Sequence, residues 1–215
     1  MSLLTLLKDD DQRENGRVDG VATGIVTNNQ DAEGLSRVKV KYPWREDSQE
    51  SYWARLAVLA AGDNRGTLWI PEVGDEVLLA FDKGDIQHPY VLGSLWNGKD
   101  KPPETNSDGQ NDTKMIRSRS GHKITLLDKK GGESVEIKTQ GGHTILLDDG
   151  AGRVEIKDSS GSNKIVIETK QNSLSIESAM SLKIKSQSID IEAGASMNIK
   201  ASGTLTIQGA LVRIN

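Results

Sequence analysis

Three histidines are the residues of this chain best suited to proton transfer or metal binding: His88, His122 and His143. They stand far apart in the sequence, and no two of them have the spacing of a metal-binding motif. No motif supports any of them as the base of a Ser-His-Asp triad. The chain has no Cys, which excludes thiolate metal sites and Cys nucleophiles. The sequence therefore predicts no catalytic residue, no cofactor and no metal site.

Acidic residues offer a second kind of chemistry. Residues 141–149 (GGHTILLDD) are similar to a calcium-binding Gly-Gly-x-Gly-x-Asp repeat, but the pattern occurs once, so we expect a turn followed by a strand. Elsewhere the carboxylates alternate with lysines, as on a solvated surface, and form no evident acid/base pair. The turns at 62–66 and 73–75 lack the Gly-Lys-Ser/Thr of a phosphate loop. We expect that the protein is not an enzyme.

The composition divides the chain into two parts. All eight aromatic residues lie between Tyr42 and Trp96, and no Pro follows Pro103. Residues 1–112 carry 12 basic and 20 acidic side chains, net −8, whereas residues 113–215 carry 15 and 11, net +4. The polar stretch 97–113 has the composition of a linker. The sequence thus predicts an N-terminal segment (1–18), a first domain (19–97), a linker (98–114) and a second domain (115–215).

The first domain alternates short apolar strand patterns with turns. Five segments show this pattern: residues 21–27, 37–42, 52–59, 76–81 and 89–95. Five short strands in about 80 residues favour a small closed barrel of the OB type. OB barrels often bind nucleic acids through aromatic platforms, but the net charge of −8 in this half argues against that function.

The second domain is a repeat of apolar-x-apolar dyads. The spacing between dyads tightens from about ten to about eight residues toward the C-terminus, and the central residue is usually polar, which is the alternation of a strand. The eleven dyads are Ile124/Leu126, Val135/Ile137, Ile145/Leu147, Val154/Ile156, Ile165/Ile167, Leu174/Ile176, Leu182/Ile184, Ile189/Ile191, Met197/Ile199, Leu205/Ile207 and Val212/Ile214.

A single dyad strand buries too little apolar surface to offset the entropy of ordering it, so the dyads must meet other dyads. Two arrangements achieve this: a solenoid within one chain, or a prism to which three chains each contribute one face. The uniform size of Ile, Leu and Val and the absence of aromatic residues favour the prism. We therefore predict an all-β protein in which an OB barrel precedes an intertwined homotrimeric β-helix, with the dyads as the trimer core. Within that core we expect Ile184, Ile191, Ile199 and Ile207 to lie on the axis.

Several runs carry a resemblance to a known family. They are residues 34–43 (GLSRVKVKYP), 52–55 (YWAR), 71–81 (PEVGDEVLLAF), 89–93 (PYVLG), 95–98 (LWNG) and 118–126 (SRSGHKITL). The sequence resembles phage baseplate assembly protein V and the VgrG-type central spikes of contractile injection systems. This resemblance implies a trimeric needle in the baseplate that pierces a target cell envelope mechanically when the sheath contracts.

The resemblance also implies partners. We expect a separate hub protein at the N-terminal segment and OB end, and transient contact with the target envelope. The chain ends on a dyad, which would leave an open prism end, so we expect a PAAR-like tip protein to contact Val212, Ile214 and Asn215. The N-terminus does not have the pattern of a secretory signal, which predicts synthesis in the cytoplasm. The resemblance implies assembly into a phage tail or injection particle.

Other functions stay open at this point. A trimeric fibre or adhesin would use the outer face of the needle to bind a receptor. A single-chain β-solenoid would be a binding module, and a spike-associated glycan hydrolase would be an enzyme.

Overall fold

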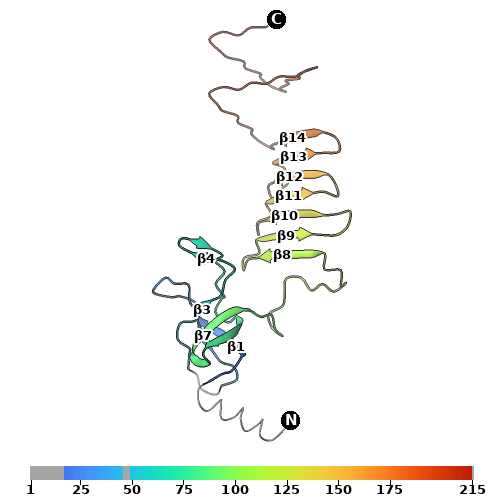
Figure 1. Cartoon of the computed structure of the whole chain (residues 1–215). Coiled ribbons are helices and arrows are strands. Elements are labelled where there is room, and N and C mark those ends of the chain that lie inside the picture. Colours follow the sequence, from blue (N-terminus) through green and yellow to red (C-terminus); the bar gives the residue numbers. More distant parts are fainter. Residues whose placement is uncertain (1–16, 46–48, 215) are drawn as a thin grey trace. The chain divides into compact units, whose positions relative to one another are not determined.

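The computed structural model describes residues 17–45 and 49–214 (Figure 1). The described residues form strands, turns and extended segments, without a helix, so the predicted all-β class is confirmed. The chain divides into two compact units between Ser107 and Asp108. This division falls inside the stretch 98–114 that the sequence predicts as a linker. Residues 1–16 of the predicted N-terminal segment 1–18 lie outside the described part of the chain.

The first unit contains a five-stranded sheet in the order β2-β1-β6-β7-β3. Its strands are antiparallel neighbours, except that β3 runs parallel to β7. Val38 and Ala54 exchange backbone hydrogen bonds of 3.0 and 2.7 Å, which join the two outer strands and close the sheet. The result is the predicted OB barrel. The strands are β1 (Val21–Asn28), β2 (Lys39–Lys41), β3 (Arg55–Leu56), β6 (Glu76–Asp82) and β7 (Asp85–Ser94).

Irregularities in register allow this sheet to curl. The β1–β2 register shifts between Val26 and Asn28, and the β6–β7 register shifts between Leu78 and Leu79. At Gly24 a Cβ would lie 2.6 Å from Leu79 Cδ1, so the absence of a side chain lets the strands close on a tight interior. The core is buried and mainly aliphatic; its most enclosed members are Val26, Val38, Val40, Ala54, Val77, Leu79 and Val91.

Polar contacts fix two loops of the barrel. Arg37 Nε donates to Asp31 Oδ2 at 2.7 Å, and this hydrogen bond holds the pKa of Asp31 well below its usual range. Tyr42 donates its hydroxyl proton to the carbonyl of Ile86, and burial raises the pKa of Tyr42 to about 12. The first contact closes the loop between β1 and β2, and the second ties Tyr42, just after β2, to strand β7.

One hairpin of the first unit differs from the sequence prediction. Residues 57–69 are all exposed and contain β4 (Ala61–Gly62) paired with β5 (Arg65–Gly66), where the sequence predicts only a turn. Asn64, with φ 50°, allows the two-residue connection.

The second unit is a seven-stranded antiparallel meander in which each strand pairs with its sequence neighbours (Figure 1). Every strand has five residues, and the pairs carry no register shift. The strands are β8 (Thr113–Arg117), β9 (Lys123–Leu127), β10 (Ser134–Lys138), β11 (Thr144–Asp148), β12 (Arg153–Lys157), β13 (Lys164–Glu168) and β14 (Ser173–Glu177). All of these pairings lie within one chain, and the predicted intertwining of residues 115–215 with other chains stays a prediction.

Candidate functional site

The regular register of the second sheet places the dyads in two straight rows on one face. Ile137, for example, lies opposite Ile124 on one side and Ile145 on the other. One row is isoleucine on every strand: Ile116, Ile124, Ile137, Ile145, Ile156, Ile165 and Ile176. The second row begins with Lys114 in β8 and continues as Leu126, Val135, Leu147, Val154, Ile167 and Leu174.

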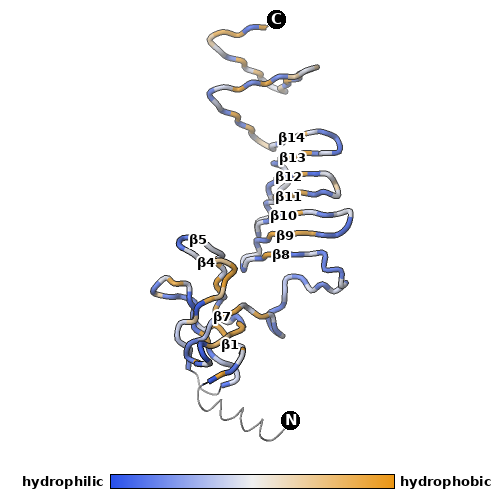
Figure 2. The backbone as a smooth tube through the Cα atoms, in the orientation of Figure 1, coloured by the Kyte–Doolittle hydropathy of each residue, from blue (hydrophilic) through white to orange (hydrophobic). Residues whose placement is uncertain are grey.

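This apolar face is half exposed. Ile124 is 39% exposed, Ile137 43% and Ile156 47%, whereas the barrel core of the first unit is at most 6% exposed. Figure 2 shows hydrophobic residues on each successive strand of the meander. A monomeric protein rarely exposes a continuous aliphatic surface of this extent, and such a surface marks an interface. Among the described residues of this unit, none forms a second layer over the rows.

The opposite face is complete within the chain. Glu155 is only 5% exposed, because Arg153 Nη2 and Lys157 Nζ each approach its carboxylate oxygens to 3.1 Å. Arg153 also reaches Glu168 at 3.5 Å, which extends the network to the next strand. Long charged side chains thus cover this face with their aliphatic stems. The dyad face has no equivalent covering, so the two faces of one sheet differ in whether they need a partner.

The single chain buries none of the last five predicted dyads, so it does not test their predicted place in a trimer core. Residues 178–214 contain no strand, and every one of them is exposed. The four isoleucines expected on the axis are all well exposed: Ile184 66%, Ile191 72%, Ile199 62% and Ile207 64%. The other members of these dyads are exposed as well: Leu182, Ile189, Met197, Leu205, Val212 and Ile214. A core at these positions is therefore not present within one chain.

Missing backbone partners explain the exposure of these dyads in the single chain. Extended backbone needs hydrogen-bond partners to form a sheet, and residues 178–214 pair with no strand of their own chain in its described part. Figure 2 shows hydrophobic and hydrophilic residues alternating along this extended segment. The alternation that predicts strands is thus present. The burial of Ile199, Ile207 and the other residues of the last five dyads stays a prediction for the trimer. Asn215, predicted to contact a tip protein, lies outside the described residues.

The residues with chemical capacity do not come together. His88 Nδ1 lies 2.8 Å from Asp85 Oδ2 near the start of β7, while His122 Nδ1 accepts a hydrogen bond from the Gln140 amide at 3.2 Å. Within residues 17–45 and 49–214 no three His, Asp or Glu side chains cluster as a metal site. Residues 141–149 form a turn followed by β11, as the sequence predicts.

One turn of the second unit is held by a carboxylate. Asn163 Nδ2 donates to Asp158 Oδ2 at 2.7 Å, and this hydrogen bond, with further ones from Ser160, lowers the pKa of Asp158 to about 2. The β12–β13 connection is therefore fixed by side chains. Asp158 has a structural role there and faces no reactive neighbour.

Comparison with known proteins finds a similarity for the first unit. Residues 22–96 match a family model described as the type VI secretion system/phage-baseplate injector OB domain. The first unit is similar to an injector OB domain over these residues. The match extends from the second residue of β1 to beyond the end of β7, so the family model and the barrel topology agree.

Several curated proteins that are similar to this chain are spike proteins. The chain is 32% identical over 123 residues to the type VI secretion system spike protein VgrG1c of Pseudomonas aeruginosa, covering 52% of this chain and 17% of the relative. It is 27% identical over 146 residues to the spike protein VgrG3 of Vibrio cholerae (61% and 14%). The actin cross-linking toxin VgrG1 of Vibrio cholerae matches at 29% over 114 residues (48% and 10%). The chain thus spans less than a fifth of the length of these relatives, and the predicted relationship to VgrG-type spikes is confirmed.

Two features of the candidate site escaped the sequence analysis. Ile116 extends the isoleucine row into β8, but its dyad partner is Lys114, so the apolar-x-apolar pattern is broken there. The distribution of charge along the two edges of the sheet depends on hairpin register, which the dyad spacing alone does not define.

None of the described residues belongs to a helix capable of spanning a lipid bilayer.

Proposed function

We propose that this chain is a structural subunit of the central spike of a contractile injection system. In this proposal three copies bring their apolar faces together on a common axis, and the resulting needle pierces a target envelope mechanically. The injector OB domain in the first unit supports the class of machine. The observation that carries the proposal is the uncovered face with its two rows of Ile, Leu and Val.

Burial of that face supplies a strong driving force. Full burial of an aliphatic side chain is worth about 1.5–3 kcal/mol, so covering a half-exposed one contributes roughly 1 kcal/mol. Thirteen such side chains in the strands of each chain give a total on the order of 10 kcal/mol per subunit. An association of this strength gives a needle that stays assembled under load.

The narrowness of the apolar face favours three copies. Each strand contributes only two inward residues, and these are of nearly equal size. A two-layer sandwich of such sheets would have a core only two residues wide. Three sheets around an axis enclose a triangular interior that two Ile, Leu or Val residues per face can fill.

The two parts of the repeat suggest two modes of assembly. Between 113 and 177 each chain forms one continuous face, because its strands pair with one another. Between 178 and 214 the spacing shortens to about eight residues, and this part of the described chain has no partner strand of its own. We infer that these later segments pair with those of the other two chains, which is the intertwined β-helix predicted from the sequence. The dyads from Leu182 to Ile214, Ile199 and Ile207 among them, would form its axial core.

We further propose the domain boundaries and partners that the sequence predicts. The first domain would span 19–97, the linker 98–114 and the needle 115–215, with a hub protein binding at the N-terminal end. A PAAR-like protein would cap Val212, Ile214 and Asn215, and the assembly would reside in a phage tail or injection particle. The action would be mechanical and non-enzymatic. The spike names of the relatives support this, while the toxin name of one relative makes a turnover assay on peptidoglycan a necessary control.

The proposal is tested by genetic replacement in the producing organism. Deleting the chain should abolish killing of target cells, and the wild-type chain should restore it. Ile191→Asp should not restore it, because three carboxylates would then meet on the axis, whereas Lys183→Asp, which changes a residue between two dyad positions, should restore it. Restoration by Ile191→Asp would contradict the proposal.

A further inference from the structure

Five charged side chains at opposite edges of the second sheet form no ion pair with any described residue: Arg117 and Lys138 at one edge, and Glu133, Asp148 and Asp149 at the other. The first edge contains residues 117–123 and 138–144, and we call it the basic edge. The second, which we call the acidic edge, contains Glu133, Asp148 and Asp149, at the turns that precede β10 and follow β11; Lys129 and Lys130 lie in the first of these turns as well. The unpartnered charges of the two edges lie at the same level of the meander, between β8 and β11.

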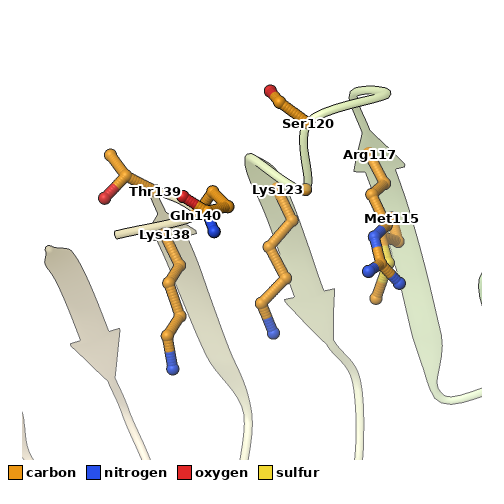
Figure 3. Close-up of a pocket in the computed structure, with 8 residues that line it drawn as sticks. Met115, Arg117, Ser120, Lys123, Lys138, Thr139 and Gln140 are labelled. Carbon is orange, nitrogen blue, oxygen red and sulfur yellow. The ribbon is translucent and has the colours of Figure 1, made fainter. Parts of the chain in front are cut away.

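The basic edge concentrates cations in register. Arg117 lies opposite Lys123, and Lys123 lies opposite Lys138, on three consecutive strands. Figure 3 shows the three side chains extending side by side along one shallow hollow. Like charges directly opposite one another destabilise a sheet. Only Lys123 is compensated, by Glu136 at 3.1 Å; within the described residues Arg117 and Lys138 form no ion pair.

Farther along the sheet, the lysines in the same row as Arg117, Lys123 and Lys138 form ion pairs with carboxylates. Lys157 pairs with Glu155 and Lys164 with Glu177, each at 3.1 Å. Residues 117–123 and 138–144, in contrast, contain no Asp or Glu at all. The excess of positive charge is therefore confined to β8, β9 and β10.

The acidic edge retains free acceptor capacity. Asp148 Oδ1 accepts from the Ala151 amide at 2.7 Å and Glu133 Oε2 from the Gly131 amide at 2.9 Å, which leaves the other oxygen of each carboxylate available. Among the residues that the structure describes, no Lys or Arg forms an ion pair with these two carboxylates or with Asp149.

The two edges cannot compensate each other within one chain. Lys138 ends β10, and Asp148 lies opposite Ser134 at the other end of the same strand. The length of a five-residue strand separates these ends by about 13 Å. In a cyclic arrangement at equal height, however, the basic edge of one copy lies beside the acidic edge of the next.

We propose that Arg117 and Lys138 of one copy form salt bridges with Asp148, Asp149 and Glu133 of a second copy of this chain. This inference rests on the proposed trimeric spike and names the contacts at the corners of its prism. Each salt bridge at an exposed corner contributes little stability and is screened by salt. Their main effect is therefore on specificity.

The apolar rows by themselves do not define the height of one chain relative to the next. The isoleucine row repeats on every strand, so a slip by one hairpin would preserve most apolar contacts. Charges present at only one level penalise such a slip, because it would bring cations beside uncharged or basic residues. The corner salt bridges thus fix the axial register of the three chains.

Charge reversal in the full chain tests this inference. Lys138→Glu, and separately Asp148→Lys with Asp149→Lys, should each lower the midpoint of thermal trimer dissociation by about 5 °C at low salt. The three changes combined should recover most of the loss, since they recreate the pairs with opposite polarity. In 1 M NaCl the differences should shrink to roughly nothing, because the Debye length there is about 3 Å. Lys129→Glu, with the same charge change on the acidic side, is the matched control and should not lower the midpoint.

Two results would overturn this inference without touching the proposed spike function, and a third would contradict the spike function itself. A trimer whose midpoint is unchanged by either reversal would show that the edges do not pair. A loss in Lys138→Glu that the triple variant does not recover, together with stabilisation of the wild type by inorganic phosphate, would show that the basic edge binds an anion. A monomeric wild-type chain would contradict the proposed function itself.

Discussion

The two sheets of this protein use the same aliphatic residues in different ways. In the first unit Val77 and Leu79 are 0% exposed, because bulges and Gly24 let the sheet close on itself. In the second unit Ile124 and Ile137 alternate just as regularly, but without register shifts the sheet stays open and they are 39% and 43% exposed. A regular alternation of apolar residues therefore predicts a buried face without saying whether the chain buries it alone.

The largest expected effect comes from a charge on the open sheet. Ile176→Asp should abolish trimer formation, because the carboxylate would enter the shared interior in three copies, while the single chain, in which Ile176 is already 52% exposed, should keep its first unit folded. The matched control is Ser175→Asp, its neighbour on the opposite face, which should leave the trimer unchanged. Light scattering after size exclusion measures both. If the two variants gave assemblies of the same mass, the proposed difference between the two faces of the sheet would be wrong.

The opposite result is expected for the closed sheet: a core substitution there should destabilise the first unit and leave the trimer intact. Leu79→Ala should lower the free energy of unfolding of the first unit by about 2–5 kcal/mol, because it leaves a cavity in a fully buried core. All four Trp residues lie in this unit, so their fluorescence reports its unfolding alone. The mass of the assembly should stay unchanged. A loss of trimer in this variant would show that the barrel, and not the dyad face, holds the copies together.

The smallest effects are those of pH, and they differ in sign between the units. The pKa of Tyr42 is raised to about 12, so its contribution to the stability of the barrel is present below pH 10 and is lost as pH rises toward 12. The pKa of Asp158 is lowered to about 2, so its contribution is present above pH 4 and is lost as pH falls toward 2. Tyr42→Phe should flatten the alkaline loss seen by Trp fluorescence. Asp158→Asn should flatten the acid loss seen by circular dichroism of the trimer, and an unchanged profile in either variant would refute that assignment.

The barrel was largely predictable because each of its strands carries its own signal. Residues 37–42 alternate strictly and Lys83–Gly84 form a tight turn, so strand and turn positions follow from local chemistry. The hairpin at 61–66 was missed because two-residue strands are too short to show alternation.

The repeat was predictable only in part. The dyads predict the strands of 123–177 correctly, but Ile199 and Ile207, expected in a core by the same pattern, are exposed in the single chain. Alternation shows which side chains share a face. It does not distinguish strands that pair within one chain from strands that pair only with another chain. The missing information is the identity of the strand that supplies the backbone hydrogen bonds.

The central claim is that the dyad face is buried between three copies, and the absolute mass of the protein in solution tests it most directly. Light scattering after size exclusion, repeated on material treated with SDS but not heated, should give a species of about 70 kDa, three times the chain mass of 23.3 kDa. Such a species, surviving in SDS, would establish the closed trimer. A species at the mass of one chain would contradict the account, because the two apolar rows would then stay exposed in the functional protein.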